Sequence, residues 1–147
     1  LVVRGPGEYE VRDIAIKGLE APRAADGRCR TVYFLTLEGA NLCILTGLHT
    51  ADLPVAVREI LADVDVLFIP VMSGEALSPA DAYKLAVSLE PRLIIPMRHD
   101  EHKDALKTFL KEGGVERVHM EPKLTVRRKE IADATGQIVV LAPAGGE

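Results

Sequence analysis

The first third of the chain alternates apolar and polar residues with the period of two that is typical of half-buried strands. A turn at Gly5-Pro6-Gly7, a polar loop over 21–30 and a turn over 38–41 separate the alternating segments. The last of these turns joins two strands as a hairpin, so we expect a β-meander. The predicted strands span 1–4, 9–17, 31–37 and 42–46.

From Leu53 onward the apolar residues recur at helical spacing, which predicts a first helix that runs to Leu61. Asp52 is its expected N-cap, and Pro54 falls in its first turn. A second helix is predicted from Ser78, a favourable N-cap followed by proline, to about Leu89.

A third helix is expected over 103–112, where Gly113-Gly114 ends the helical pattern. Continuous apolar runs over 64–71 and 92–96 predict strands that are covered on both faces. They imply a parallel pair joined by right-handed crossovers. The tail is predicted to form short strands, over 115–120, 124–128 and 137–141.

The pattern therefore predicts an α/β fold in which a β-meander is followed by α-β-α-β-α and short C-terminal strands. The chain has 147 residues, which is the size of one domain, and we expect a single domain over 1–147. Hydrophobic residues make up 48% and charged residues 27%, an ordinary globular balance.

The net charge of −4 argues against binding to nucleic acid or to an anionic membrane surface. The densest basic stretch, Arg127-Arg128-Lys129, is followed at once by Glu130, and we interpret it as the solvated side of a strand. No apolar run approaches the length of a membrane span. Two cysteines, Cys29 and Cys43, do not make a disulfide framework, so we expect a cytoplasmic protein. Leu1 already falls in a predicted strand, so we expect the chain either to begin inside a longer gene product or to have been trimmed.

Candidate chemistry gathers after strands, where open α/β sheets bind ligands. The richest segment is the one after the strand 92–96, which holds His99 and His102 among carboxylates, and His49 follows the hairpin strand. Imidazole and carboxylate suit zinc, iron or manganese, and a catalytic zinc needs about three protein ligands. The candidate carboxylates are Asp100, Glu101 and Asp104 beside the two histidines, and Asp52 near His49. The alternative interpretation is a solvated helix entry, in which Asp100 or Glu101 interacts favourably with the N-terminal dipole of the third helix.

Other chemistries lack their motifs. Ser73 and Ser78 are not part of a G-x-S-x-G nucleophile elbow. The chain contains neither the phosphate-binding G-x-x-x-x-G-K nor the dinucleotide-binding G-x-G-x-x-G. His119 falls on a late predicted strand, where a surface histidine is the more frequent finding.

Several segments follow one another in an order that resembles the later part of metallo-β-lactamase-fold hydrolases, of the small bacterial predicted metal-dependent hydrolase type. The resemblance covers nearly the whole chain and implies part of an αββα sandwich that lacks the early half of the fold. The segments are Gly5–Val11, Thr31–Tyr33, Val64–Val71, Leu77–Ala82 and Leu89–Met97.

The resemblance also implies a one- or two-metal site that activates water, with ligands in three regions. The first is an early H-x-H-x-D-H cluster, which this chain lacks. The second is a Gly-Asp pair after the hairpin strand, where this chain has Gly47-Leu48. The third is a histidine after Ile-Pro-Met, where this chain has Arg98 and then His99.

These departures predict a metal-free and non-catalytic relative that acts as a binding or oligomeric module, with no cofactor. Arg98 is then expected to hold a carboxylate or phosphate, or to form a salt bridge to Glu75 or Asp100. The alternative is a hydrolase with zinc or another divalent metal, whose displaced or subunit-shared site uses His49, His99 and His102. Because a sheet without the early half would be exposed, we also expect a homo-oligomer or a partner chain that covers it.

Overall fold

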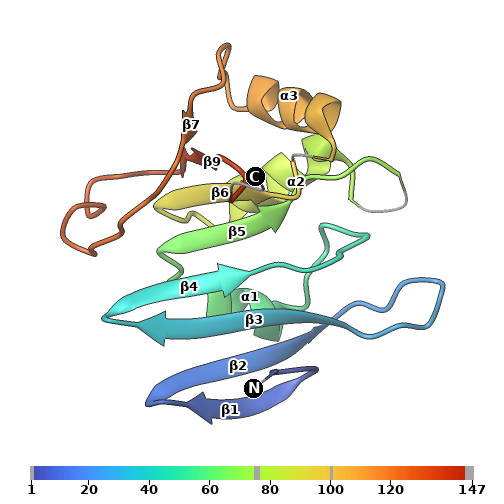
Figure 1. The fold of residues 1–147 in the computed structure, drawn as a ribbon. Helices are drawn as coiled ribbons and strands as arrows, with labels where there is room; N and C mark the ends of the chain where they lie inside the picture. Colours follow the sequence, from blue (N-terminus) through green and yellow to red (C-terminus); the bar gives the residue numbers. More distant parts are fainter. Residues whose placement is uncertain (1, 75–76, 100, 145–147) are drawn as a thin grey trace.

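The computed structural model describes residues 2–74, 77–99 and 101–144. In these ranges the chain forms a seven-stranded sheet in the order β1-β2-β3-β4-β5-β6-β8 and a small sheet of β7 and β9 (Figure 1). β1 to β4 are antiparallel neighbours, whereas β4, β5, β6 and β8 are parallel. The strands are β1 (Gly7–Val11), β2 (Ile14–Ala21), β3 (Arg30–Leu37), β4 (Ala40–Ile44), β5 (Val66–Pro70), β6 (Leu93–Met97), β7 (Met120–Glu121), β8 (Gln137–Ile138) and β9 (Val140–Leu141).

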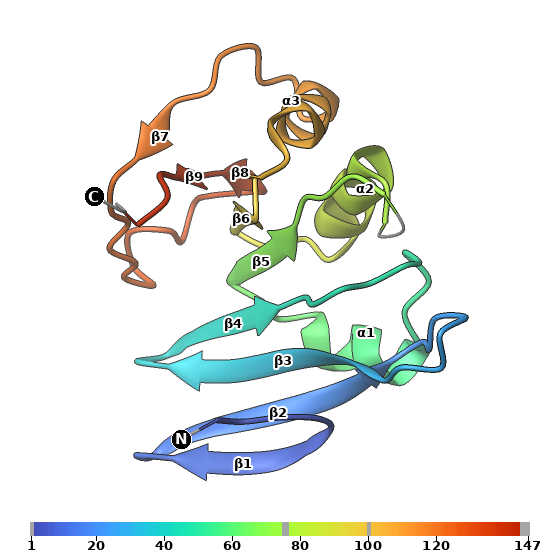
Figure 2. The same ribbon diagram turned by 45° about the vertical axis from the view of Figure 1, so that its right-hand side comes forward.

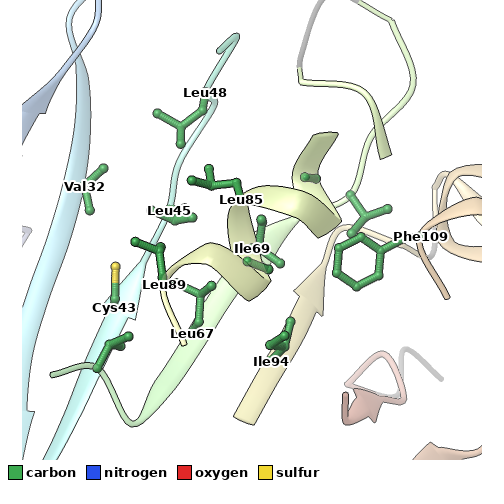
Figure 3. Close-up of a cluster of buried hydrophobic side chains, with 14 of the residues drawn as sticks. Val32, Cys43, Leu45, Leu48, Leu67, Ile69, Leu85, Leu89, Ile94 and Phe109 are labelled. Carbon is green, nitrogen blue, oxygen red and sulfur yellow. The ribbon is translucent and has the colours of Figure 1, made fainter. Parts of the chain in front are cut away.

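The helices lie on one face of the large sheet and bury their apolar sides against it (Figure 2). They are α1 (Val55–Leu61), α2 (Pro79–Ser88) and α3 (Lys103–Glu112). Figure 3 shows part of this core, in which Leu85 and Phe109 from the helices face Leu67, Ile69 and Ile94 from the strands. The burial of these side chains is the main stabilisation of the fold.

The opposite face of the sheet is covered over β5 and β6 by the segment 124–134, which packs against Leu93 and Ile95. Over β2, β3 and β4 the same face carries two apolar cross-strand rows, which we call the open face. Its side chains are half-buried, and no described helix covers them. The rows are Ile16-Leu35-Leu42 and Tyr33-Ile44, and the face ends where Leu42 and Phe68 of β5 pack against the cluster that the segment 124–134 covers.

The structure confirms the predicted α/β class and the order of the central elements. The single strand predicted over 9–17 is wrong, because Arg12 and Asp13 take left-handed conformations and turn the chain between β1 and β2. Residues 2–4 of the predicted first strand form no strand, and Leu1 lies outside the described residues. Asp52 does not cap α1, since Pro54 occupies the N-cap position without a side-chain hydrogen bond.

The C-terminal prediction is only partly correct. Of the strands expected over 115–120 and 124–128, the structure has only β7, and Arg127-Arg128-Lys129 lies in an irregular segment that ends in a turn. The alternating residues Leu124 and Val126 still face the sheet, so their period reflects burial without strand pairing. Of the described residues, no helix is long and apolar enough to cross a membrane.

Candidate functional site

The loops that follow β4, β5 and β6 meet at one edge of the sheet, because these strands are parallel. Hydrogen bonds join the loops to one another. The backbone N–H of Leu77 donates to the carbonyl of Leu48 at 2.9 Å, and that of Val71 donates to Met97 at 3.0 Å. The candidate ligand positions of the sequence therefore lie on neighbouring loops.

Leu48 does not face an open site at this edge. Its side chain is 3% exposed and belongs to the core on the helix side of the sheet, near Leu45 (Figure 3). Leu77 lines the same small cavity. The preceding Gly47 has a φ of +48°, and a Cβ there would lie 3.4 Å from the Cδ of Arg30. A hydrocarbon side chain and a neighbouring guanidinium thus occupy the position where the resemblance implies a metal-binding aspartate.

Arg98 begins the loop after β6 and has a φ of +60°, a left-handed conformation that is uncommon for a long side chain. Its side chain is 56% exposed, and its guanidinium lies 3.5 Å from the carboxylate of Glu101. The expected partners Glu75 and Asp100 lie outside the described residues. An exposed ion pair of this kind contributes little to stability, so the guanidinium can exchange Glu101 for another anion.

His99 is 6% exposed, and its Nε2 lies 2.8 Å from the carbonyl oxygen of Leu141. A carbonyl only accepts hydrogen bonds, so Nε2 must carry the proton that it donates. This bond connects the loop after β6 to β9, and it uses the Nε2 atom that would otherwise be a potential metal ligand.

The two other candidate histidines, His49 and His102, take no part in the hydrogen bond between His99 and Leu141. His102 is half-buried at the N-cap of α3, and its Nδ1 accepts a long hydrogen bond, 3.5 Å, from the backbone of Ser73. His49 is exposed on the loop after β4. In 2–74, 77–99 and 101–144, no group of three His, Cys, Asp or Glu side chains could hold a metal ion.

The carboxylates near these loops are also engaged elsewhere or directed to solvent. Glu101 pairs with Arg98, and Asp104 lies 3.9 Å from Lys107 with its side chain 99% exposed. Asp52 is exposed, on the loop before α1. The described residues at the two implied ligand positions, an apolar side chain and a cation, therefore do not fit a catalytic metal.

Cys43 also lacks the properties of a ligand or nucleophile. It lies at 0% exposure in the helix-side core, and burial raises its pKa to about 12. The thiol is therefore fully protonated at neutral pH. Cys29 is exposed, on the loop before β3.

Sequence reasoning missed the role of Arg30 at this edge. Its side chain packs against Gly47, forms an ion pair with Asp26 at 3.1 Å, and leaves a buried Nε without a partner among the described residues. In the sequence Arg30 stands at the end of a polar loop, and nothing there indicates that its side chain lies beside Gly47. Its proximity to Gly47 arises only because β4 follows β3 as an antiparallel neighbour.

Comparisons with solved structures agree with this fold. A protein from Thermotoga maritima, assigned as a zinc-dependent hydrolase of the metallo-β-lactamase superfamily, is 28% identical, with a TM-score of 0.72 over 96% of this chain and 71% of its own. A protein from Parabacteroides distasonis, assigned as a metal-dependent hydrolase, is 21% identical, with a TM-score of 0.50 over 78% of this chain and 54% of its own. A metallo hydrolase from the archaeon Ignicoccus hospitalis is 16% identical, with a TM-score of 0.51 over 86% of this chain and 59% of its own.

A search of curated proteins found no match. The chain spans 71% of the Thermotoga protein and less than two thirds of the other two. The family model of the beta-lactamase superfamily domain matches residues 1–98, which is well over half of the chain. Together with the fold, this match shows that the chain belongs to the metallo-β-lactamase-fold hydrolase family.

Proposed function

We propose that this chain is a metal-free, non-hydrolytic member of its family that acts as a binding or oligomeric module. The observation that carries the proposal is the state of Leu48, which is packed in the core at a position where the family places a metal-binding aspartate. A hydrocarbon side chain cannot donate electrons to a metal, so leucine cannot serve as the ligand at this position.

The charges at the edge of the sheet support the same proposal. Arg98 occupies the position that the family gives to a metal-binding histidine, and Arg30 packs against Gly47 beside the aspartate position. Guanidinium groups stay protonated in proteins, so both residues bring permanent positive charge. Such charge disfavours a divalent cation and favours an anion, so a carboxylate or phosphate ligand is expected near Arg98.

The module would associate through the open face. Its rows of aromatic and aliphatic side chains are the kind of surface that chains bury when they assemble. We therefore propose that a second copy of the chain, or a partner chain, covers this face.

Light scattering after size-exclusion chromatography at micromolar concentration tests the association. The expected result is a dimer that Leu35→Lys converts to a monomer. Val87→Lys provides the matched control, because Val87 is an exposed apolar residue on α2, on the other side of the sheet. A monomeric wild-type chain, or equal behaviour of the two variants, would refute self-association through the open face.

A second candidate is a hydrolase with a displaced or subunit-shared site at His49, His99 and His102, using zinc or another divalent metal. The hydrogen bond between Ser73 and His102 favours it, since this bond draws the loop after β6 against the loop after β5. The Thermotoga relative is assigned as zinc-dependent, which gives zinc as the first metal to test.

Thermal unfolding in zinc and in a chelator distinguishes the two candidates. A metal that binds only the folded chain, at a concentration well above its dissociation constant, would raise the midpoint temperature of unfolding by about 4 °C or more. The proposed function predicts the same midpoint in both solutions. A zinc-dependent rise that His49→Ala and His102→Ala abolish would overturn it and support the displaced site.

A further inference from the structure

A groove runs between α3 and the segment that carries β7, away from the open face. It has a volume of about 510 Å³, within the range of small-molecule sites. Leu106 and Pro143 contribute apolar walls, and Leu106 is almost fully buried. We call this feature the α3–β7 groove.

Two large apolar side chains beside the groove remain in contact with solvent. Val118 and Met120 line it, and each is 43% exposed. Met120 lies in β7, which pairs with β9 and is therefore held in place. A ligand with an apolar body would remove both side chains from water, and methionine adapts readily to the shape of such a ligand.

Among the described residues, the charged side chains that line the groove have one sign. Lys103 and Lys107 line it from adjacent turns of α3, and no described lining residue is acidic. Asp104 lies 3.9 Å from Lys107, in a pair in which the lysine side chain is 76% exposed and the aspartate side chain 99% exposed. So weak a pair leaves the ammonium group of Lys107 available to an anionic head group, and Lys103 is exposed on the same helix.

The wall of the groove beneath these lysines is rigid. His99 lines it and is held by its hydrogen bond to Leu141, so its imidazole does not need to be ordered when a ligand binds. A second groove, near the β3–β4 turn, is also basic, but Glu38 and Glu130 line it and Arg127 is paired with Glu130 at 3.8 Å. Its charges are largely compensated, which distinguishes it from the α3–β7 groove.

We propose that the α3–β7 groove binds an amphipathic carboxylate, with the hydrocarbon chain against Leu106, Val118 and Met120 and the carboxylate between Lys103 and Lys107. The proposal goes beyond the function proposed above. A long-chain neutral molecule would use the apolar walls but would gain nothing from the two lysines.

The test is a titration of the isotopically labelled full chain with octanoate, followed by the backbone amide signals in two-dimensional NMR. Saturable shifts are expected in the segments 103–107 and 118–120. 1-Octanol and octanoate share a hydrocarbon chain, so the alcohol measures the apolar contribution alone. Octanoate is expected to bind about fivefold more tightly, the scale of two exposed ion pairs.

Lys103→Gln/Lys107→Gln should reduce octanoate binding to the level of octanol, whereas Lys111→Gln on the same helix should leave it unchanged. Val118→Asp should weaken both probes, because it places a carboxylate on the apolar wall. The proposal is overturned if octanoate does not bind at millimolar concentration, if its shifts fall outside the groove, or if the double lysine variant binds it as well as the native chain.

Discussion

The Nε2 of His99 lies 2.8 Å from the carbonyl oxygen of Leu141 and so connects the loop after β6 to β9. His99→Ala removes this hydrogen bond and leaves space where a buried ring stood. We expect the free energy of unfolding to fall by about 2 kcal/mol. Urea unfolding measures it, with His102→Ala as a half-buried control that should change stability by less than about 1 kcal/mol. Equal effects of the two substitutions would show that the bond to Leu141 is not structural.

Asp65 is a second polar group that holds the sheet together from within. Its side chain is 4% exposed. The carboxylate accepts hydrogen bonds from the backbone N–H of Asn41 at 2.8 Å and from the Nε of Arg92 at 3.1 Å. Asp65→Ala leaves both donors without their acceptor, so we expect a loss of about 3 kcal/mol in chemical denaturation. Asp104→Ala, at an exposed pair, should leave the denaturation curve unchanged. A loss below about 1 kcal/mol for Asp65→Ala would contradict the role of this network.

Cys43 predicts a dependence of stability on alkaline pH. Its pKa is raised from 9.0 to about 12 in the folded chain, so the unfolded chain loses the thiol proton first as the pH rises. The contribution of the protonated Cys43 thiol to the free energy of unfolding is therefore constant below pH 9. It declines progressively as the pH rises from 9 to 12. Denaturation of the native chain and of Cys43→Ala over this range should show an extra decline only in the native chain. Parallel pH profiles would contradict the shift.

The two thiols should also differ in reactivity. At pH 8 a thiol reagent is expected to modify one cysteine of the folded chain, the exposed Cys29, and both cysteines in urea. The Cys29→Ser variant provides the control, since its folded form should not react. Rapid modification of that variant would show that Cys43 is accessible.

Leu48→Asp restores the residue type that the family resemblance implies, and it tests whether the core has adapted to leucine. The side chain is 3% exposed, so a carboxylate there would be desolvated without a partner. We expect a loss of at least about 3 kcal/mol by chemical denaturation. Leu37→Asp, at a position 41% exposed in β3, should cost far less. A Leu48→Asp variant as stable as the native chain would show that this position still tolerates a ligand.

The sequence predicted the central part of the fold well, because its elements are marked by strong local signals. Ser78 caps α2 and accepts from the N–H of Asp81, as its position before Pro79 indicated. The apolar runs became β5 and β6, and the glycines at 113–114 follow the end of α3. These features depend on neighbouring residues, so they can be read from the chain without knowledge of its tertiary contacts.

The turn between β1 and β2 was missed although a signal was present. Val11 and Ile14 are three residues apart, so the apolar period changes phase between them, as it must across a two-residue turn. The site was harder to predict. Nothing near His99 in the sequence indicates a hydrogen bond to Leu141, which lies 42 residues away, and the position of Arg30 depends on strand pairing.

The central claim, that this family member binds no catalytic metal, is tested most directly by its metal content. The purified chain is exposed to zinc, manganese and iron in turn, desalted thoroughly and measured by inductively coupled plasma mass spectrometry. We expect no retained metal, with the same background for the native chain and for the His49→Ala/His102→Ala variant. Near-stoichiometric metal in the native chain, lost in that variant, would contradict the claim and establish a site built from the displaced histidines.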